Sequence, residues 1–329
     1  MNDKVVVLGS NSFTGSHFVR HLLKQGYEVI GISRSAESTT VPLPYQMVEP
    51  RNFQFHQLDL NKQLSKIVSL IGRLKPRYLV NFAAQSMIGE SWQLPTHWYQ
   101  TNTLSTIALH ERLTQIDFLD KYVHVSTPEV YGHRDDRIIE NRHYQPLTPM
   151  ATSRAAADMS LMNFYEGYHF PVVFTRSANI YGPGQALFRI VPRTIMSFLA
   201  GRSLQLHGGG QSVRSFVYVE DVCSATCKIM EQAAPPEIYH ISGEHFLKVR
   251  ALVDLIGQQL GVPVDQLVEA IGEGEAKEVE CILCSKKLRT TLDWKDQVEL
   301  QDGISITIEW IKQNYSLLSE QPLRYNHKP

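Results

Sequence analysis

The sequence predicts an α/β fold, a doubly wound parallel sheet with a smaller C-terminal α/β substrate lobe. Two observations lead to this prediction. Short apolar runs alternate with helical patterns through the first half of the chain, which is typical of βαβ units and a parallel sheet. A glycine-containing loop, residues 9–15, joins the first apolar run to the first helical pattern. Because parallel crossovers are right-handed, helices on both faces of one sheet are the natural closure.

The elements of the first half follow from hydrophobic periodicity. The expected strands are short apolar runs at residues 4–8, 28–33, 53–58, 78–82, 122–126 and 172–176. The expected helices carry apolar residues at helical spacing and lie at residues 15–25, 64–73, 95–115 and 149–167. Gly26 is expected to end the first of these helices.

The composition excludes several classes of protein. The 329 residues carry 32 Lys and Arg against 33 Asp and Glu, a formal net charge of -1. That balance predicts neither a nucleic-acid partner nor an anionic membrane surface. No run of about 18 apolar residues is present and no signal peptide is expected, so we predict a cytoplasmic protein without a membrane partner.

The cysteines are expected to be small buried hydrophobic residues. Cys223 and Cys227 lie one helical turn apart in an apolar stretch, and Cys281 and Cys284 lie in a stretch that resembles a strand. Residues three apart in a strand face opposite ways. We therefore expect no metal site and no disulfide.

The loop from Gly9 to Gly15 has the context of a dinucleotide-binding loop, because it follows a strand and opens a helix. Gly9 permits a tight turn, Gly15 permits close packing, and the helix N-terminus attracts a pyrophosphate. This context predicts a Rossmann-type domain, although an ordinary turn stays an alternative because Ser12 stands where a glycine is usual. The residues expected to contact the cofactor are Gly9, Asn11, Ser12, Phe13, Thr14 and Gly15.

The end of the second strand favours NADP over NAD. NAD-binding domains tend to carry an acidic residue there for the ribose 2′-hydroxyl. Here the residues are Ser33, Arg34 and Ser35, which suit a 2′-phosphate. NAD stays possible, since an arginine can also stack on adenine.

The second half of the chain is less regular and contains the cluster Gly208–Gly210. Residues 1–177 are assigned to the dinucleotide-binding domain and residues 178–329 mainly to the second lobe. Residues 216–242 are expected to return to the first domain, with strands at 216–219 and 238–241. The tail, residues 323–329, is expected to be disordered or bound to the surface.

Several segments, in order, resemble one family. Besides the Gly9–Gly15 loop these are Asp59-Leu60, Asn81-Phe-Ala-Ala-Gln-Ser86, Ser126-Thr-Pro-Glu-Val-Tyr-Gly132, Pro149-Met-Ala-Thr-Ser-Arg-Ala155, Arg176-Ser-Ala-Asn-Ile-Tyr-Gly-Pro-Gly184 and Arg214-Ser-Phe-Val-Tyr-Val-Glu-Asp221. They resemble the extended short-chain dehydrogenases that act on nucleotide sugars, and within them the nucleotide-sugar 4,6-dehydratases of dTDP-glucose and GDP-mannose. The resemblance covers nearly the whole chain.

The resemblance implies positions for both ligands. Asp59 and Leu60 would lie against the adenine, and Phe82, Ala83, Ala84 and Ser126 would line the rest of the cofactor. A nucleotide-diphosphate sugar would be the substrate, and its sugar would meet Gln85, Ser86 and Glu90. Asn179, Arg189 and Arg214 would contact its diphosphate, which arginine binds bidentately. Surface ion pairing is the alternative for the two arginines.

The chain departs from the family at the catalytic residues. The family's tyrosine and lysine, four residues apart on one helix, are here Met150 and Arg154. A thioether takes no proton near neutral pH, whereas Arg154 still supplies a positive charge to the cofactor ribose. At the strand end the family's Thr-Asp-Glu is Thr127-Pro128-Glu129. Glu129 would be the base for the C5 proton, and Pro128 offers no proton to a leaving hydroxyl.

Three interpretations follow from this departure. The first is a nucleotide-sugar dehydratase with a rearranged base, for which Tyr131, His133, His143, Tyr144 or a water on Thr127 are candidates. The second is an NAD(P)-dependent nucleotide-sugar epimerase or reductase. The third is a homologue that binds cofactor and nucleotide sugar without turnover, and a chain whose tyrosine was replaced artificially also fits. The first is favoured because elimination needs a base such as Glu129.

The helices at residues 95–115 and 149–167 carry wide apolar faces, which exceed what one sheet face covers. In the family, two such helices pair across a two-fold axis. We therefore predict a homodimer with a four-helix interface, with core packing as the alternative.

Overall fold

The computed structural model describes residues 3–48, 52–134, 136–272 and 281–327. Its largest element is a seven-stranded sheet with the order β10-β6-β5-β4-β1-β2-β3, in which all neighbours are parallel. The strands are β1 Lys4–Leu8, β2 Glu28–Ser33, β3 Phe53–Gln57, β4 Tyr78–Asn81, β5 Lys121–Val125, β6 Val172–Ser177 and β10 Ile238–Ile241. The predicted doubly wound parallel sheet is therefore confirmed.

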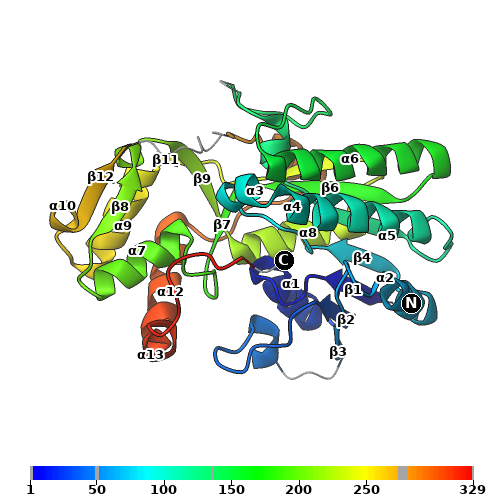
Figure 1. Ribbon diagram of the computed structural model, residues 1–329, viewed down its shortest axis with the longest axis horizontal. Coiled ribbons are helices and arrows are strands. Elements are labelled where there is room, and N and C mark those ends of the chain that lie inside the picture. The colour runs from blue at the N-terminus through cyan, green and yellow to red at the C-terminus, as the bar shows by residue number, and fades with distance from the viewer. Residues whose placement is uncertain (1–2, 49–51, 135, 273–280, 328–329) are drawn as a thin grey trace.

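Helices cover both faces of this sheet (Figure 1). The helices are α1 Phe13–Lys24, α2 Leu64–Leu74, α3 Gly89–Gln93, α4 Pro95–Trp98, α5 Thr106–Leu113, α6 Pro149–Tyr168 and α8 Val219–Gln232. Alternate residues of β1 face opposite sides, as expected of a strand buried on both faces. Val5 and Val7 pack with Phe18 of α1, while Val6 and Leu8 belong to the core formed with α2, α5 and α6.

A second group of elements follows β6 and carries two small sheets (Figure 1). Its elements are β7 Asn179–Tyr181, α7 Ile190–Leu199, β8 Leu204–His207, β9 Val213–Tyr218, β11 Phe246–Lys248, α9 Val249–Leu260, α10 Val264–Leu267, β12 Val268–Ile271, α11 Lys286–Thr291, α12 Leu300–Gln313 and α13 Tyr315–Leu318. The strands β7, β9 and β11 form one sheet, and β8 pairs with β12 in the other. Single 3₁₀ turns lie at Pro44–Met47, Pro128–Tyr131 and Gly208–Gly210.

The two stretches that were expected to add strands to the main sheet differ in outcome. Ile238–Ile241 pairs with β6 and joins the main sheet, as predicted. The stretch 216–219 does not: it forms the end of β9 and the first residue of α8, and β9 pairs with β7 and β11. That prediction is wrong because an apolar run identifies a strand but not its partner. The division of the chain into two domains at residue 177 stays a prediction.

The predicted helix at residues 95–115 is interrupted. Between α4 and α5 the backbone forms a π-helical segment, Tyr99–Ser105. Asn102 in this segment turns inward, accepts a hydrogen bond from the Gln85 backbone N–H at 2.8 Å and donates to Ser153 Oγ at 2.9 Å. These buried partners pull the segment out of regular α-helix, and π-helical segments are frequent at functional sites. The predicted strand around Cys281–Cys284 is reduced to one bridge, Leu283 to Ile138.

Candidate active site

The loop between β1 and α1 is tightly built. Gly9 has φ +77°, and a Cβ on it would lie 2.8 Å from the backbone nitrogen of Ala83, so only glycine fits there. A Cβ on Gly15 would lie 2.2 Å from the Gly9 carbonyl oxygen. Ser12 is the N-cap of α1, and its Oγ accepts a hydrogen bond from the Gly15 N–H at 3.1 Å. A serine thus replaces the usual glycine because its side chain begins the helix.

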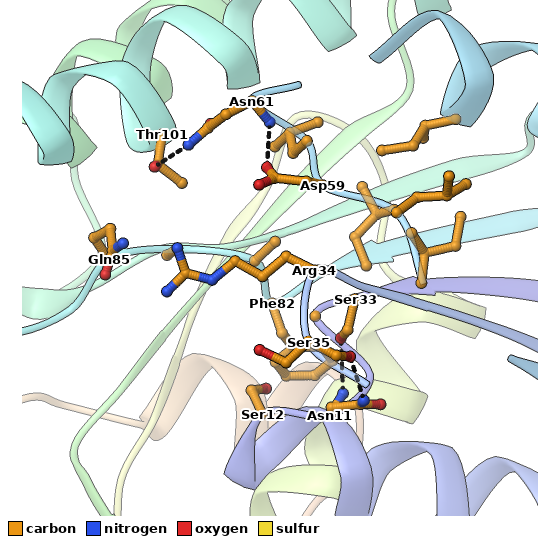
Figure 2. A pocket seen from close by; sticks show the side chains of 18 residues that line it. Asn11, Ser12, Ser33, Arg34, Ser35, Asp59, Asn61, Phe82, Gln85 and Thr101 are labelled. Atoms are coloured by element: carbon orange, nitrogen blue, oxygen red, sulfur yellow. Dashed lines mark hydrogen bonds between the residues drawn. The ribbon is translucent and has the colours of Figure 1, made fainter. Parts of the chain in front are cut away.

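A pocket opens at the carboxyl ends of the strands beside this loop (Figure 2). It is a half-open cavity of about 250 Å³ at the edge of the sheet. The predicted cofactor-binding residues that line it are Gly9, Asn11, Ser12, Ser33, Arg34, Ser35, Asp59, Leu60, Phe82, Ala83 and Ala84. The predicted residues that lie outside its lining are Phe13, Thr14, Gly15, Ser126 and Arg154. Phe13, Thr14 and Gly15 form the first turn of α1 behind the loop.

Other residues of the lining were not predicted as cofactor ligands. They are Leu8, Ile32, Leu58, Asn61, Ile67, Gln85 and Thr101. Asn61 donates from its backbone N–H to Asp59 Oδ1 at 2.7 Å and from its side chain to Thr101 Oγ1 at 3.0 Å (Figure 2). The signal that could have revealed Asn61 is its place two residues after Asp59 at a strand end. Gln85, predicted for the sugar, also lines this pocket, and its role stays a prediction.

The end of β2 is held to the loop by hydrogen bonds. Ser33 Oγ accepts from the Asn11 backbone N–H at 2.9 Å, and the Asn11 amide donates to the Ser35 carbonyl at 3.0 Å. Tyr45 donates to Asn11 Oδ1 at 2.9 Å. In Figure 2 the Arg34 side chain extends over the pocket in the direction of Gln85. Ser33 is thus engaged within the protein, and Arg34 and Ser35 stand beside the open space.

The end of β5 carries the candidate catalytic groups. The Thr127 hydroxyl donates to Glu129 Oε2, so the two predicted side chains lie together. Met150, the second residue of α6, is buried with 3% of its surface exposed. Arg154 is also buried and donates to the Val125 carbonyl, and burial lowers the pKa of its guanidinium. Arg154 therefore ties α6 to the end of β5.

A buried ion pair stands next to this strand end. Asp158 Oδ2 accepts from Arg176 Nη2 at 2.8 Å and from Ser126 Oγ at 2.7 Å, and His124 Nε2 lies 3.3 Å from Oδ1. Burial alone would raise the pKa of Asp158, but these partners hold it at about 2. The predicted cofactor residue Ser126 is thus fixed to α6 by this carboxylate.

Two of the candidate replacement bases, Tyr131 and Tyr144, already make hydrogen bonds to other buried side chains. The Tyr131 hydroxyl lies 2.7 Å from His240 Nε2, and the side chain is buried under the Arg176 guanidinium. The Tyr144 hydroxyl accepts from Arg176 Nη2 at 3.1 Å, and burial raises its pKa to about 12. His133 and His143 are exposed on the same loop.

The predicted substrate residues lie on both groups of elements. Arg189 Nη2 donates to Ser86 Oγ at 3.4 Å, which joins the segment before α7 to the segment after β4. Asn179 is exposed and donates to the Ser215 carbonyl at 3.2 Å, next to the buried Arg214. Glu90 is half-buried in α3. The structure therefore brings Ser86 to Arg189, and Asn179 to the strand that carries Arg214.

The cysteines are placed differently from one another. Cys223 and Cys227 are buried in α8, and burial raises the pKa of both thiols. Cys281 and Cys284 are half-buried, contrary to the expectation of full burial, and Cys281 Sγ lies 3.7 Å from the carbonyls of Pro128 and Gly132. Among the residues that the structure describes, no group of three His, Cys, Asp or Glu side chains could hold a metal ion.

The parallel sheet, the glycine loop and the pocket at the strand ends define a dinucleotide-binding protein of the Rossmann type. Comparison with known proteins narrows this class. The family model for GDP-mannose 4,6 dehydratase matches residues 6–307, so the chain belongs to that family of nucleotide-sugar 4,6-dehydratases within the extended short-chain dehydrogenases.

Relatives and solved structures agree with this assignment. The human dTDP-D-glucose 4,6-dehydratase is 28% identical over 321 residues, which span 95% of this chain and 91% of the relative. The dTDP-glucose 4,6-dehydratase DesIV from Streptomyces venezuelae, solved with NAD bound, superimposes with a TM-score of 0.88 at 27% identity, covering 98% of this chain and 100% of that one. A UDP-glucose 4-epimerase from Thermus thermophilus, solved with NAD, gives 0.83 at 25% identity, covering 94% and 99%.

The residues present fit a nicotinamide dinucleotide. The Gly9 turn brings backbone close to the pocket, α1 points its N-terminus toward it, and Asp59 lies at its far wall. Within the described ranges no helix is long and apolar enough to cross a membrane. The cytoplasmic location stays a prediction.

Proposed function

We propose that the protein is a nucleotide-sugar 4,6-dehydratase that uses a nicotinamide dinucleotide and in which Glu129 carries the proton transfers. The observation that carries the proposal is the Thr127–Glu129 hydrogen bond at the carboxyl end of β5. An elimination of water between C5 and C6 of a hexose needs a base for the C5 proton. Membership of the family supports the reaction class.

The cofactor, when bound, supplies a reversible hydride acceptor, so that the net reaction loses one water and changes no oxidation state overall. The residues that would hold it are the loop from Gly9 to Ser12, Arg34, Asp59 and the backbone from Phe82 to Ala84. Arg189 and Arg214 would bind the substrate diphosphate.

The proton steps balance with one carboxyl group. Thr127, which donates to Glu129, would take the C4 hydroxyl proton as it passes its own to Glu129. Glu129 would then give that proton to the departing C6 hydroxyl through one oxygen while its other oxygen takes the C5 proton. The proton kept by Glu129 finally returns to C5. This scheme needs neither a tyrosine at Met150 nor an acid at Pro128, and the hydrogen bonds of Tyr131 and Tyr144 to other groups support it.

Mass analysis tests the proposal. The protein is incubated with UDP-, dTDP-, GDP- and CDP-hexoses and either NAD or NADP, and each nucleotide sugar is followed by mass. We expect one sugar to lose a single water without net cofactor reduction. Glu129→Gln should lower the rate by roughly 10²–10⁴-fold, whereas Glu309→Gln, on the exposed side of α12, should leave it unchanged. Loss of water that survives Glu129→Gln would contradict the proposed base.

A second candidate is a homologue that binds both ligands without turnover. The buried Met150 and the engagement of Arg154 with the Val125 carbonyl favour it. It predicts saturable binding of a nucleotide sugar and no change in mass with any sugar. An epimerase or reductase would instead give a sugar of changed stereochemistry or reduction state.

We propose NADP as the preferred cofactor, with NAD as the alternative. Arg34 and Ser35 support NADP because no carboxylate stands at the end of β2. The solved relatives named above carry NAD. We also propose a homodimer through the helices α5 and α6.

A further inference from the structure

The C-terminal segment after α13 forms no helix or strand and lies with one side against the molecule. Leu323, Tyr325 and His327 are half-buried, whereas Arg324 and Asn326 between them are exposed. The alternation therefore shows a segment seated on the surface along its length, and we call residues 323–327 the tail.

The inward side chains of the tail contact both groups of elements. The His327 ring stacks on Trp98 of α4 with ring centroids 4.8 Å apart and lies 2.8 Å from His97 Nδ1 through its Nε2. The Tyr325 ring packs edge-on against Phe188, with centroids 5.2 Å apart. Phe188 precedes α7, and α4 packs against α6, which lies on the main sheet. In Figure 1 the tail, drawn in red, runs from α13 back toward α1 and α4.

Residues of the candidate site surround these contacts. Phe188 adjoins Arg189, which reaches Ser86, and Trp98 is three residues from Thr101 in the pocket wall. Burial raises the pKa of Tyr325, with Glu90, Arg34 and Arg189 close enough to act on it, and burial lowers the pKa of His327, with His97, Arg34 and Glu90 nearby. Arg34 itself lines the pocket. The tail therefore lies where the cofactor side and the diphosphate side of the site meet.

We propose that the tail is a gate across the mouth of the active-site cleft. Contacts of His327 hold it to α4, and the ring contact of Tyr325 holds it to the segment before α7. Its contacts must break for a dinucleotide or a nucleotide sugar to enter or leave. A gate of this kind slows both association and dissociation of the ligand, because the same barrier must be crossed in either direction. It changes the binding free energy, and so Kd, very little. The inference rests on the proposed binding of a nicotinamide dinucleotide in this pocket.

Two matched variants of the full chain test the gate. The inward pair, Tyr325→Ser with His327→Ser, removes both sets of contacts that hold the tail. The outward pair, Arg324→Ser with Asn326→Ser, alters the exposed side chains of the same segment. Association and dissociation of NADP and of NAD are followed by stopped-flow protein fluorescence. For the inward pair we expect both rate constants to rise roughly tenfold, equivalent to about 1.4 kcal/mol, with a much smaller change in Kd. The outward pair should behave as the parent. A chain ending at residue 322 should reproduce the inward pair.

The outcomes separate the gate from the cofactor assignment. Binding with the same two rate constants in the parent and the inward pair would overturn the gate alone. A faster dissociation with unchanged association would also overturn it, since it would make the tail a ligand contact. Absence of binding to the parent and to every variant would overturn both the gate and the proposed cofactor site.

Discussion

At the scale of single residues, hydrogen bonds already made within the protein decide which side chains are left for a ligand. Ser33 and Ser12 both face the pocket, yet Ser33 accepts from the Asn11 backbone and Ser12 caps α1. A hydroxyl oxygen can accept again, but its direction is already fixed. If NADP is the cofactor, as proposed, recognition of its ribose 2′-phosphate would fall mainly on Arg34, whose guanidinium is always charged.

The first residue-scale prediction concerns Arg34. Arg34→Ala should weaken NADP binding about 10–100-fold, since a charged hydrogen bond to the 2′-phosphate is lost, and should change NAD binding far less. Isothermal titration of both dinucleotides measures the two values of Kd. Arg34→Lys is the matched control, which keeps the charge and should fall between the parent and Arg34→Ala. An equal loss for NADP and NAD would show that Arg34 contacts a part shared by both cofactors.

Sequence reasoning at this scale succeeded where spacing alone fixes geometry. Gly9 and Gly15 were predicted from their spacing, and the close approach of Ala83 and of the Gly9 carbonyl explains both. The contact of Arg154 with the cofactor ribose stays a prediction; what the sequence did not indicate is its hydrogen bond to the Val125 carbonyl. The helical spacing to Met150 indicates a shared face, but no spacing reveals which carbonyl a long side chain will reach.

At the scale of elements, buried polar side chains redirect what hydrophobic periodicity predicts. The apolar pattern at residues 95–115 indicated one helix, yet Asn102 bonds to Gln85 and Ser153 and the backbone widens into a π-helical segment. The same holds at the edge of the main sheet. There β10 is pinned beside β6 by pairing, and its His240 reaches the Tyr131 hydroxyl of the turn after β5.

This contact between β10 and the turn predicts a dependence of stability on pH. Burial, followed by the charge of Arg176, lowers the pKa of His240 from 6.5 to about 3. The groups around it are Arg176 on β6, Tyr131 in the turn, Glu140, which accepts from the His240 backbone N–H at 3.0 Å, and Lys287 on α11. In the unfolded chain the His240 imidazole therefore becomes protonated below about pH 6.5, whereas in the folded chain it stays neutral until about pH 3.

The sign of the effect follows from proton linkage. Keeping His240 neutral contributes to the free energy of unfolding in full above pH 6.5. This contribution is lost as the pH falls toward 3, at up to about 1.4 kcal/mol per pH unit. His240→Gln keeps a hydrogen-bonding partner for Tyr131 and removes the titration. Urea unfolding between pH 7 and pH 4 should give a shallower fall in unfolding free energy for the variant. If the unfolding free energies of parent and variant fell equally with pH, His240 would not be the titrating group.

At the scale of the whole molecule, the sequence was sufficient for the parallel sheet but not for long-range partners. The βαβ alternation predicted strands β1 to β6 and the return of β10. The partner of β9 could not be predicted, because antiparallel pairing with β11 depends on residues far along the chain. The contacts of Tyr325 and His327 with Phe188 and Trp98 were equally hidden, since the tail was expected only to be disordered or surface-bound.

The predicted homodimer also belongs to this scale. Several apolar residues that suggested an interface are buried within the chain itself, among them Trp98, Leu109, Leu113 and Leu161. Two exposed apolar side chains lie on or beside the helices proposed to pair: Leu104, 60% exposed in the π-helical segment before α5, and Met159, 52% exposed on α6. Because a stable interface buries about 1,600 Å² with an apolar centre, these side chains are the expected centre of the contact.

A charge at this centre should therefore break the dimer. The parent is expected to sediment as a dimer at micromolar concentration, and Leu104→Glu or Met159→Glu should sediment as a monomer, because each buries an unpaired carboxylate in the contact. Leu317→Glu, at an exposed leucine of α13, is the matched control and should stay dimeric. Circular dichroism verifies that each variant is folded. A folded parent that sediments as a monomer would reject the dimer, and dimeric variants at both positions would place the interface on another face.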